Sequence, residues 1–177
     1  MNAEKRRKEI LNKLVASQEP ITGNELSTVF NVSRQVIVQD IAVLRAAGNE
    51  ILATPSGYLV INTGTDNKIK KIYAVKHSSD ELEKELLIMV DSGGKVLDVI
   101  VEHALYGELK GLLMLACRED VYAFVKKLKE TGAKPLSSLT TGIHLHTVEA
   151  PNEEIHNKIA EKLKKEGILL EDDYKAL

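Results

Sequence analysis

Residues 32–48 of the chain read VSRQVIVQDIAVLRAAG, and this stretch decides the architecture of the N-terminal third. Ser33 supplies the hydroxyl oxygen that a helix N-cap needs, and Gly48 is the residue type that most often ends a helix. Between them, Ile37, Ile41 and Leu44 recur at helical spacing and form one apolar stripe. The pattern predicts an amphipathic helix over residues 34–47.

The residues on either side complete a small domain. An amphipathic helix is expected over residues 3–16, and Thr22 with Glu25 matches a capping box that starts a second, short helix. Downstream, the turn sequence TPSG at residues 54–57 separates two short apolar runs, which predicts a two-stranded hairpin. Helices joined by a tight turn and followed by such a hairpin are typical of a winged helix-turn-helix.

The polar face of the third helix carries the side chains suited to reading DNA. Arg34, Gln35 and Gln39 point outward near its N-terminus, and Arg pairs with guanine and Gln with adenine in the major groove. Arg6 and Arg7 in the first helix are candidates for phosphate contacts, which position a protein without specifying sequence. The alternative interpretation is the solvated face of a small helical module.

A second domain is expected after the polar stretch NTGTDN at residues 62–67. We therefore predict a winged helix-turn-helix domain over residues 1–62 and a regulatory domain over residues 68–177. Chain-wide composition excludes several classes: 44% hydrophobic residues exclude whole-chain disorder, and one cysteine excludes a disulfide framework. The apolar runs are too short to cross a membrane. The expectation is a soluble, cytoplasmic protein with no membrane partner.

The second domain has the pattern of an α+β fold. Its expected elements are a strand at 69–77, a helix at 80–91, strands at 95–102 and 109–116, a helix at 118–131, a strand at 142–149 and a helix at 152–166. The order β-α-β-β-α-β followed by a C-terminal helix suggests a ferredoxin-like α/β sandwich with spatial strand order 4-1-3-2. In that topology the first and last strands are antiparallel neighbours.

All five histidines of the chain lie in this domain. His77 ends the first strand, while His144 and His146 lie two residues apart near the start of the last strand and so share one face. Glu85, on the following helix, can turn back toward them. Three imidazoles and a carboxylate suit one divalent transition metal ion, zinc or nickel. The alternative is a pair of exposed strand histidines and one acid of a solvated acidic run.

The other two histidines receive different interpretations. His103 ends the second strand, which the expected topology places roughly 10 Å from the first strand and about 15 Å from the last. His103 and the nearby Tyr106 are therefore candidates for the wall of an adjoining ligand pocket, outside the set of metal ligands. His156, within a charged stretch of the last helix, is expected at the surface.

The motifs together support a family resemblance. Residues 32–48 with the hairpin resemble the winged helix-turn-helix of biotin-operon-type repressors. With VKH at 75–77, VEHALYG at 101–107 and GIHLHTVEAP at 142–151, residues 5–167 resemble the NiaR family, repressors of NAD biosynthesis with a C-terminal three-histidine domain. The resemblance implies operator DNA as partner, nicotinic acid as co-repressor and a bound metal ion, and by motif position it assigns the ligands to His77, Glu85, His144 and His146.

Three functions compete at this stage. The first is a ligand-sensing repressor that binds operator DNA as a homodimer, because one winged helix reads too few base pairs for specificity. The second is a regulator for which the metal ion itself is the signal. The third is a metal-dependent hydrolase of a nicotinate derivative. Because no separate general base accompanies the histidines, and a DNA-binding module occupies a third of the chain, we expect a regulator and not an enzyme.

Overall fold

The computed structural model describes residues 2–60 and 68–171. The chain divides into two compact units, Met1–Asp66 and Asn67–Leu177, each with its own core. The predicted linker at 62–67 lies outside the described residues, so the limits of the two domains stay a prediction.

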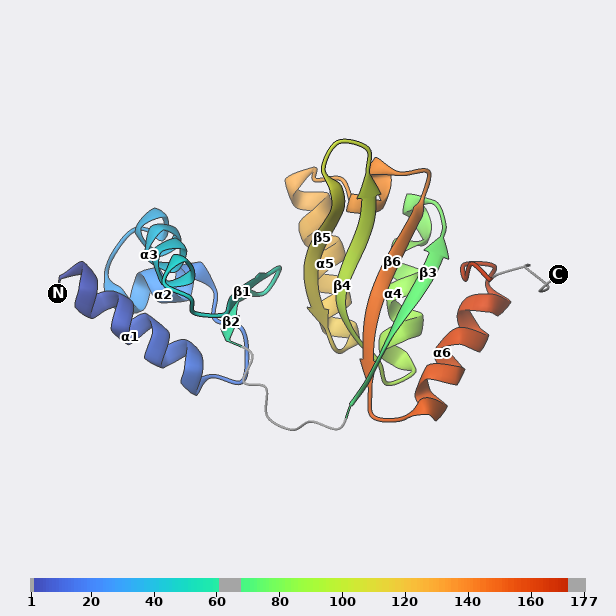
Figure 1. Ribbon diagram of the computed structural model, residues 1–177, viewed down its shortest axis with the longest axis horizontal. Helices are drawn as coiled ribbons and strands as arrows, with labels where there is room; N and C mark the ends of the chain where they lie inside the picture. Colours follow the sequence, from blue (N-terminus) through green and yellow to red (C-terminus); the bar gives the residue numbers. More distant parts are fainter. Residues whose placement is uncertain (1, 61–67, 172–177) are drawn as a thin grey trace. The chain divides into compact units, whose positions relative to one another are not determined.

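The first unit has the predicted winged helix-turn-helix elements (Figure 1): α1 (Ala3–Ala16), α2 (Gly23–Phe30), α3 (Arg34–Ala46), β1 (Ile51–Thr54) and β2 (Gly57–Val60). The capping box forms. Thr22 Oγ1 accepts a hydrogen bond from the Glu25 N–H at 3.1 Å, and the Glu25 carboxylate accepts one from the Thr22 N–H at 2.8 Å. Ser33 caps α3 by accepting from the N–H of Val36. The predicted apolar stripe of α3 is buried against α1, α2 and β1.

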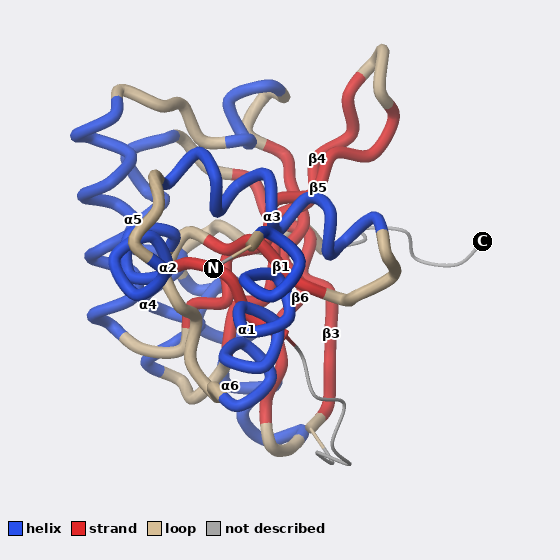
Figure 2. The backbone as a smooth tube through the Cα atoms, turned by 90° about the vertical axis from the view of Figure 1, so that its left-hand side faces the viewer, coloured by secondary structure: helices blue, strands red, loops and turns tan. Residues whose placement is uncertain are grey.

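The second unit is a four-stranded sheet with three helices on one face, an α+β arrangement as predicted (Figures 1 and 2). Its elements are β3 (Ile69–Lys76), the 3-10 turn η1 (Ser79–Glu81), α4 (Leu82–Asp91), β4 (Lys95–His103), β5 (Gly107–Leu115), α5 (Arg118–Thr131), η2 (Leu136–Leu139), β6 (Ile143–Ala150) and α6 (Glu153–Lys165). One apolar core joins all three helices to the sheet, including Leu86, Val121 and Ile159 from the helices and Val75 and Val148 from the strands.

The order of the strands differs from the expected 4-1-3-2. The observed order is β3-β6-β4-β5, with every neighbouring pair antiparallel, so the last strand lies between the first and the second. The first and last strands are antiparallel neighbours, as predicted. Three lysines in β3, Lys70, Lys71 and Lys76, suit an edge strand, whereas a central strand is paired along both of its edges. This charge pattern favours the observed order over the expected one.

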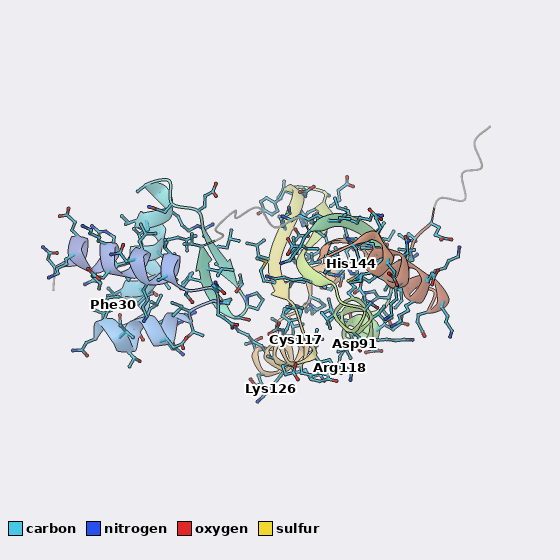
Figure 3. The ribbon with its side chains drawn as sticks, turned by 90° about the horizontal axis from the view of Figure 1, so that it is seen from below. Phe30, Asp91, Cys117, Arg118, Lys126 and His144 are labelled. Atoms are coloured by element: carbon cyan, nitrogen blue, oxygen red, sulfur yellow. The ribbon has the colours of Figure 1, made fainter. Side chains whose placement is uncertain are left out.

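Contacts at the ends of the helices link neighbouring elements of the second unit. The Arg118 guanidinium at the start of α5 donates two hydrogen bonds of 2.7 Å to the Asp91 carboxylate at the end of α4 (Figure 3). After α6 the chain returns to the outer edge of β3, where the Lys76 N–H donates to the Ile168 carbonyl and the Leu170 N–H to the Ala74 carbonyl. The edge of β3 is thereby covered at the end that leads to His77.

Candidate metal centre and DNA interface

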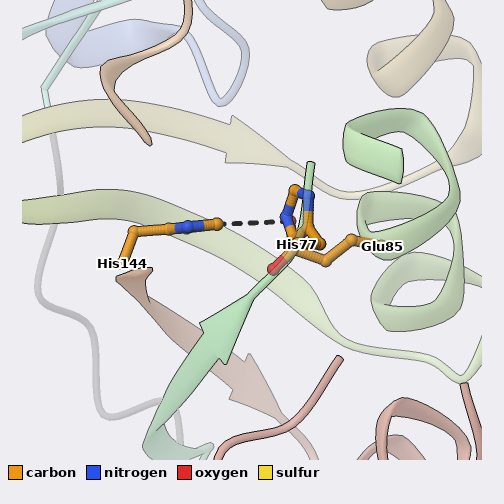
Figure 4. Close-up of side chains that lie close together, drawn as sticks. All are labelled: His77, Glu85 and His144. Atoms are coloured by element: carbon orange, nitrogen blue, oxygen red, sulfur yellow. Dashed lines mark hydrogen bonds and ion pairs between the residues drawn. The ribbon is translucent and has the colours of Figure 1, made fainter. Parts of the chain in front are cut away.

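Three segments of the second unit bring the predicted metal ligands together. His77 directly follows β3, Glu85 lies in the first turn of α4, and His144 lies in β6 (Figure 4). His146 lies two residues further along β6. The antiparallel pairing sets Val75 opposite His144, which places the end of β3 beside the start of β6. All four side chains lie on the helix side of the sheet and are at most 9% exposed.

The carboxylate of Glu85 occupies the middle of the cluster. Its Oε2 lies 2.5 Å from His77 Nε2 and 3.4 Å from His144 Nε2, and its Oε1 lies 3.4 Å from His146 Nε2. The ligand atoms of His77, Glu85 and His144 lie within 4.8 Å of one another. This spacing matches a set of side chains that can converge on one ion.

Backbone carbonyls fix the orientation of all three rings. His77 Nδ1 lies 2.7 Å from the Ser78 carbonyl, His144 Nδ1 2.9 Å from that of Gly142, and His146 Nδ1 2.7 Å from that of Asp98. A carbonyl can only accept, so each Nδ1 carries a hydrogen and each neutral ring keeps a lone pair on Nε2. Hydrogen bonding at one ring nitrogen is how metal-binding histidines are commonly held ready at the other.

The electrostatics of the cluster favour positive charge beside the Glu85 carboxylate. Burial lowers the pKa of His77 and His146, but the charge and hydrogen bonding of Glu85 outweigh it and raise both pKa values. Burial raises the pKa of Glu85, yet the charge of His146 and the hydrogen bonds from His144 and His77 hold it well below its usual range. Neutral Nε2 lone pairs and an ionised carboxylate repel one another unless protons or a metal ion lie between them.

One atom tests directly whether a metal fits. Glu85 Oε1 is buried, and within the described parts of the chain it has no hydrogen-bond partner, although His146 Nε2 lies 3.4 Å away. A buried oxygen without a partner is costly and rare in native proteins. Three imidazole nitrogens with this oxygen form a donor set suited to zinc or nickel, so the residues fit the expected ion.

The argument that kept His103 out of the set of metal ligands used the wrong strand order, so its place outside that set stays a prediction. Strand β4 pairs directly with β6 over Lys95–Ile100, so it is not three strands away from it. His103 lies past that pairing, in the β4–β5 hairpin, where its Nδ1 accepts the N–H groups of Leu105 and Tyr106. The Tyr106 ring lies 5.2 Å from the His103 ring and is 70% exposed.

His156 corrects a second expectation, because it is buried and not at the surface. It is 1% exposed, its Nε2 lies 2.9 Å from the Ile69 carbonyl, and its Nδ1 lies 2.7 Å from the Tyr73 hydroxyl. The charged neighbours of His156 suggested exposure, but it shares a helical stripe with Ile159 and Leu163, both fully buried. That spacing was the signal that the sequence offered.

The residues predicted to read DNA are accessible. Arg34, Gln35 and Gln39 are exposed on α3, the second helix of the helix-turn-helix. The stem and Nε of Arg34 run close to the backbone of Gly23, where an added Cβ would meet them at 3.4–3.6 Å. The Arg34 side chain therefore lies beside the N-terminus of α2.

The two arginines of α1 have partners inside the first unit. Arg6 donates to the buried Asp40 carboxylate of α3 at 2.5 and 3.3 Å, and Arg7 reaches the same carboxylate at 3.5 Å. The Arg6 side chain is 13% exposed and that of Arg7 28% exposed. This geometry gives Arg6 a structural role between α1 and α3, which the sequence analysis missed because Asp40 lies far away along the chain. Arg7 keeps more of its surface for a phosphate contact.

In comparison with known proteins, two different family models match the two parts of the chain. A family model described as HTH domain matches residues 6–59, and one described as 3H domain matches residues 70–172. A helix-turn-helix joined to a 3H domain with a buried histidine cluster defines a DNA-binding transcription regulator. No helix in residues 2–60 and 68–171 has the length and apolarity to cross a membrane.

Close relatives identify the family. The probable transcription repressor NiaR of Thermotoga maritima is 44% identical over 169 residues, covering 96% of this chain and 95% of that protein. The transcription repressor NadR of Bacillus subtilis is 41% identical over 169 residues, covering 94% of each. An uncharacterized protein of Methanothermus fervidus is 37% identical over 103 residues, 54% of this chain and 16% of that protein. The chain belongs to the NiaR/NadR family of transcription repressors. Repressors are not enzymes, so the hydrolase alternative is set aside.

Proposed function

We propose that this repressor controls genes of NAD biosynthesis or nicotinate uptake in the cytoplasm. It binds operator DNA as a homodimer, with nicotinic acid as co-repressor and one zinc or nickel ion in the three-histidine centre. The observation that carries the proposal is the convergence of three Nε2 atoms on the buried Glu85 carboxylate, one oxygen of which has no hydrogen-bond partner among the described residues. The family resemblance supplies the pathway and the co-repressor.

The metal ion would be held by His77, Glu85, His144 and His146. Bound there, it supplies a Lewis-acidic centre that attracts a carboxylate or a pyridine nitrogen. The chain's own residues provide the rest: the carbonyls of Ser78, Gly142 and Asp98 keep the rings in the binding tautomer. His103 and Tyr106 offer a nitrogen and an aromatic ring to a ligand that approaches from the hairpin.

DNA recognition would use α3. Arg34, Gln35 and Gln39 read base edges, while Arg7 contacts phosphate. The sheet face opposite the helices is a surface for the second copy, because Ile72 is 63% and Ile143 45% exposed there. Exposed isoleucines on two neighbouring strands, with the exposed Lys70 and Lys76 on the same face of β3, would form a mixed apolar and polar interface in a homodimer.

A metal-responsive regulator is the second candidate. The observation in its favour is the burial of the centre, since Glu85, His144 and His146 are each at most 3% exposed. Closed sites are typical of metal ions with a structural or sensing role, whereas sites that bind a further ligand keep an open position.

Operator titration by fluorescence anisotropy separates the two candidates. Metal-replete protein is titrated at fixed salt alone, with nicotinic acid and with nicotinamide. A co-repressor that tightens operator binding a hundredfold requires a coupling free energy of about 2.7 kcal/mol, and the operator must tighten nicotinic acid equally. We expect nicotinic acid to act and nicotinamide to act poorly, because its amide is uncharged and a weaker metal ligand.

Controls assign the effect to the centre. The His146→Ala variant should lose the response to nicotinic acid and keep basal operator binding. If neither pyridine changes the wild-type curve but removal of the metal does, the metal-responsive candidate replaces the co-repressor.

A further inference from the structure

Strand β4 contains an irregularity beside the metal centre. Its register shifts between Val96 and Asp98 against both neighbouring strands, β5 and β6. A β-bulge of this kind leaves one residue outside the ladder and turns local backbone groups in new directions. Bulges next to functional sites commonly re-aim a group, so the groups of this bulge are of interest.

Asp98 makes three contacts at the bulge, although it is only 5% exposed. Its backbone carbonyl accepts the Nδ1 hydrogen of His146 at 2.7 Å. Its side-chain Oδ1 accepts the backbone N–H of Thr147, the next residue of β6, at 3.0 Å. Its Oδ2 lies 3.6 Å from Lys110 Nζ on β5. Asp98 thus joins the three strands at the level of His146.

His146 depends on this residue in a way that the other two histidines do not. The carbonyls that hold His77 and His144 belong to Ser78 and Gly142, one and two residues away in the same segment. The carbonyl that holds His146 is 48 residues away, on another strand. The β4–β6 ladder pairs Asp98 with Thr147, and the hydrogen bond from the Thr147 N–H to the Asp98 carboxylate adds a side-chain link at the bulge, where the ladder is irregular.

We propose that Asp98 is a positioning residue for His146. Its carboxylate anchors the bulge to β6, and the anchored carbonyl holds the His146 ring with Nε2 facing Glu85. The expected change in metal affinity rests on the proposed metal centre. The orientation and tautomer of the His146 ring can be measured with or without the ion. Outer partners of this kind typically change metal affinity ten- to a hundredfold when they are removed.

Two variants test the role of the carboxylate. Asp98→Ala removes the anchor and should weaken Co²⁺ and Zn²⁺ binding by about tenfold or more, measured by competition with a chelating indicator. It should also alter the visible absorption of the Co²⁺-loaded protein. Asp98→Asn keeps an oxygen that can accept from Thr147, so it should restore affinity and spectrum close to wild type. Val125→Ala, a core substitution in α5 away from the centre, controls for lost stability.

Imidazole nitrogen NMR of the metal-free proteins separates this inference from the metal centre itself. Wild type and Asp98→Asn should show His146 with its hydrogen on Nδ1, and Asp98→Ala should show a mixture of tautomers. If wild type binds no metal, the proposed centre fails, while the NMR comparison still decides the role of Asp98. Wild-type ring signals and Co²⁺ affinity in Asp98→Ala would overturn the inference, and so would an equal loss of affinity in Val125→Ala.

Discussion

Replacing Gly142 by alanine should lower the stability of the second unit far more than the same replacement at Gly132. Both glycines have a left-handed backbone, with φ of +87° and +66°. An alanine in that region costs about 1–2 kcal/mol at either position. At Gly132, no atom of the described residues outside its immediate chain neighbours and its own helix backbone lies within 4 Å of the added Cβ, so the backbone cost is the whole effect.

At Gly142 the added Cβ would lie 2.5 Å from the carbonyl oxygen of His77, which is backbone and has to move. Forcing an extra methyl group into packed structure adds about 1–3 kcal/mol. The total is therefore about 2–5 kcal/mol at Gly142 against about 1–2 kcal/mol at Gly132. In a unit of this size 1 kcal/mol corresponds to about 4–8 °C in melting temperature, so Gly142→Ala should melt at least about 8 °C below wild type.

Urea unfolding of the full chain in the presence of a chelator measures both losses without a contribution from metal. A second readout is Zn²⁺ affinity, which Gly142→Ala should lower, because His77 is displaced and the Gly142 carbonyl holds His144. Gly132→Ala should keep wild-type affinity. Equal losses of stability in the two variants would refute the close approach of Gly142 to His77.

Further predictions concern the centre, the DNA interface and the buried histidine. His146→Ala should be purified with little metal and His103→Ala with a full complement, as measured by elemental analysis; the reverse result would exchange their assignments. Metal affinity should fall as the pH drops through the raised pKa values of His77 and His146, and so already above the ordinary imidazole range, because imidazole must be neutral to bind; an indicator titration at several pH values checks this. Arg34→Ala should cost about 1–3 kcal/mol on operator and little on unrelated DNA, whereas Arg7→Ala should weaken both and reduce the salt dependence; the same loss on both DNAs for Arg34→Ala would contradict base reading. Tyr73→Phe removes a buried hydrogen bond to His156 and should lower the free energy of unfolding by about 1–3 kcal/mol in denaturant titrations; unchanged stability would show that the hydroxyl contributes nothing.

Local patterns in the sequence predicted most elements of both units. Caps such as Thr22 and Ser33 and the turn glycines mark helix and hairpin ends through short-range hydrogen bonds, and these bonds form as expected. The candidate metal ligands also followed from the sequence, because alternation along a strand puts His144 and His146 on one face whatever the order of the strands.

Features that depend on distant partners could not be predicted in the same way. Amphipathic periodicity says which face of a strand is buried but not which strand lies next to it, so the strand order was wrong. Arg6 was assigned to phosphate because its partner Asp40 belongs to another helix. The role of Asp98 depends on a backbone carbonyl and a bulge, and neither has a distinctive residue type.

The position of β6 in the middle of the sheet has a consequence for biosynthesis. The first unit is complete once its short-range contacts form, and N-terminal domains generally fold first as the chain leaves the ribosome. The sheet of the second unit is different, because β3 and β4 do not pair with each other. Each pairs with β6, which is made after both of them. His77 and Glu85 therefore meet His144 and His146 only after β6 has emerged, and the proposed metal ion would bind only then. A nascent chain would thus carry a finished helix-turn-helix unit before the histidine cluster forms, and truncated products would retain the former without the latter.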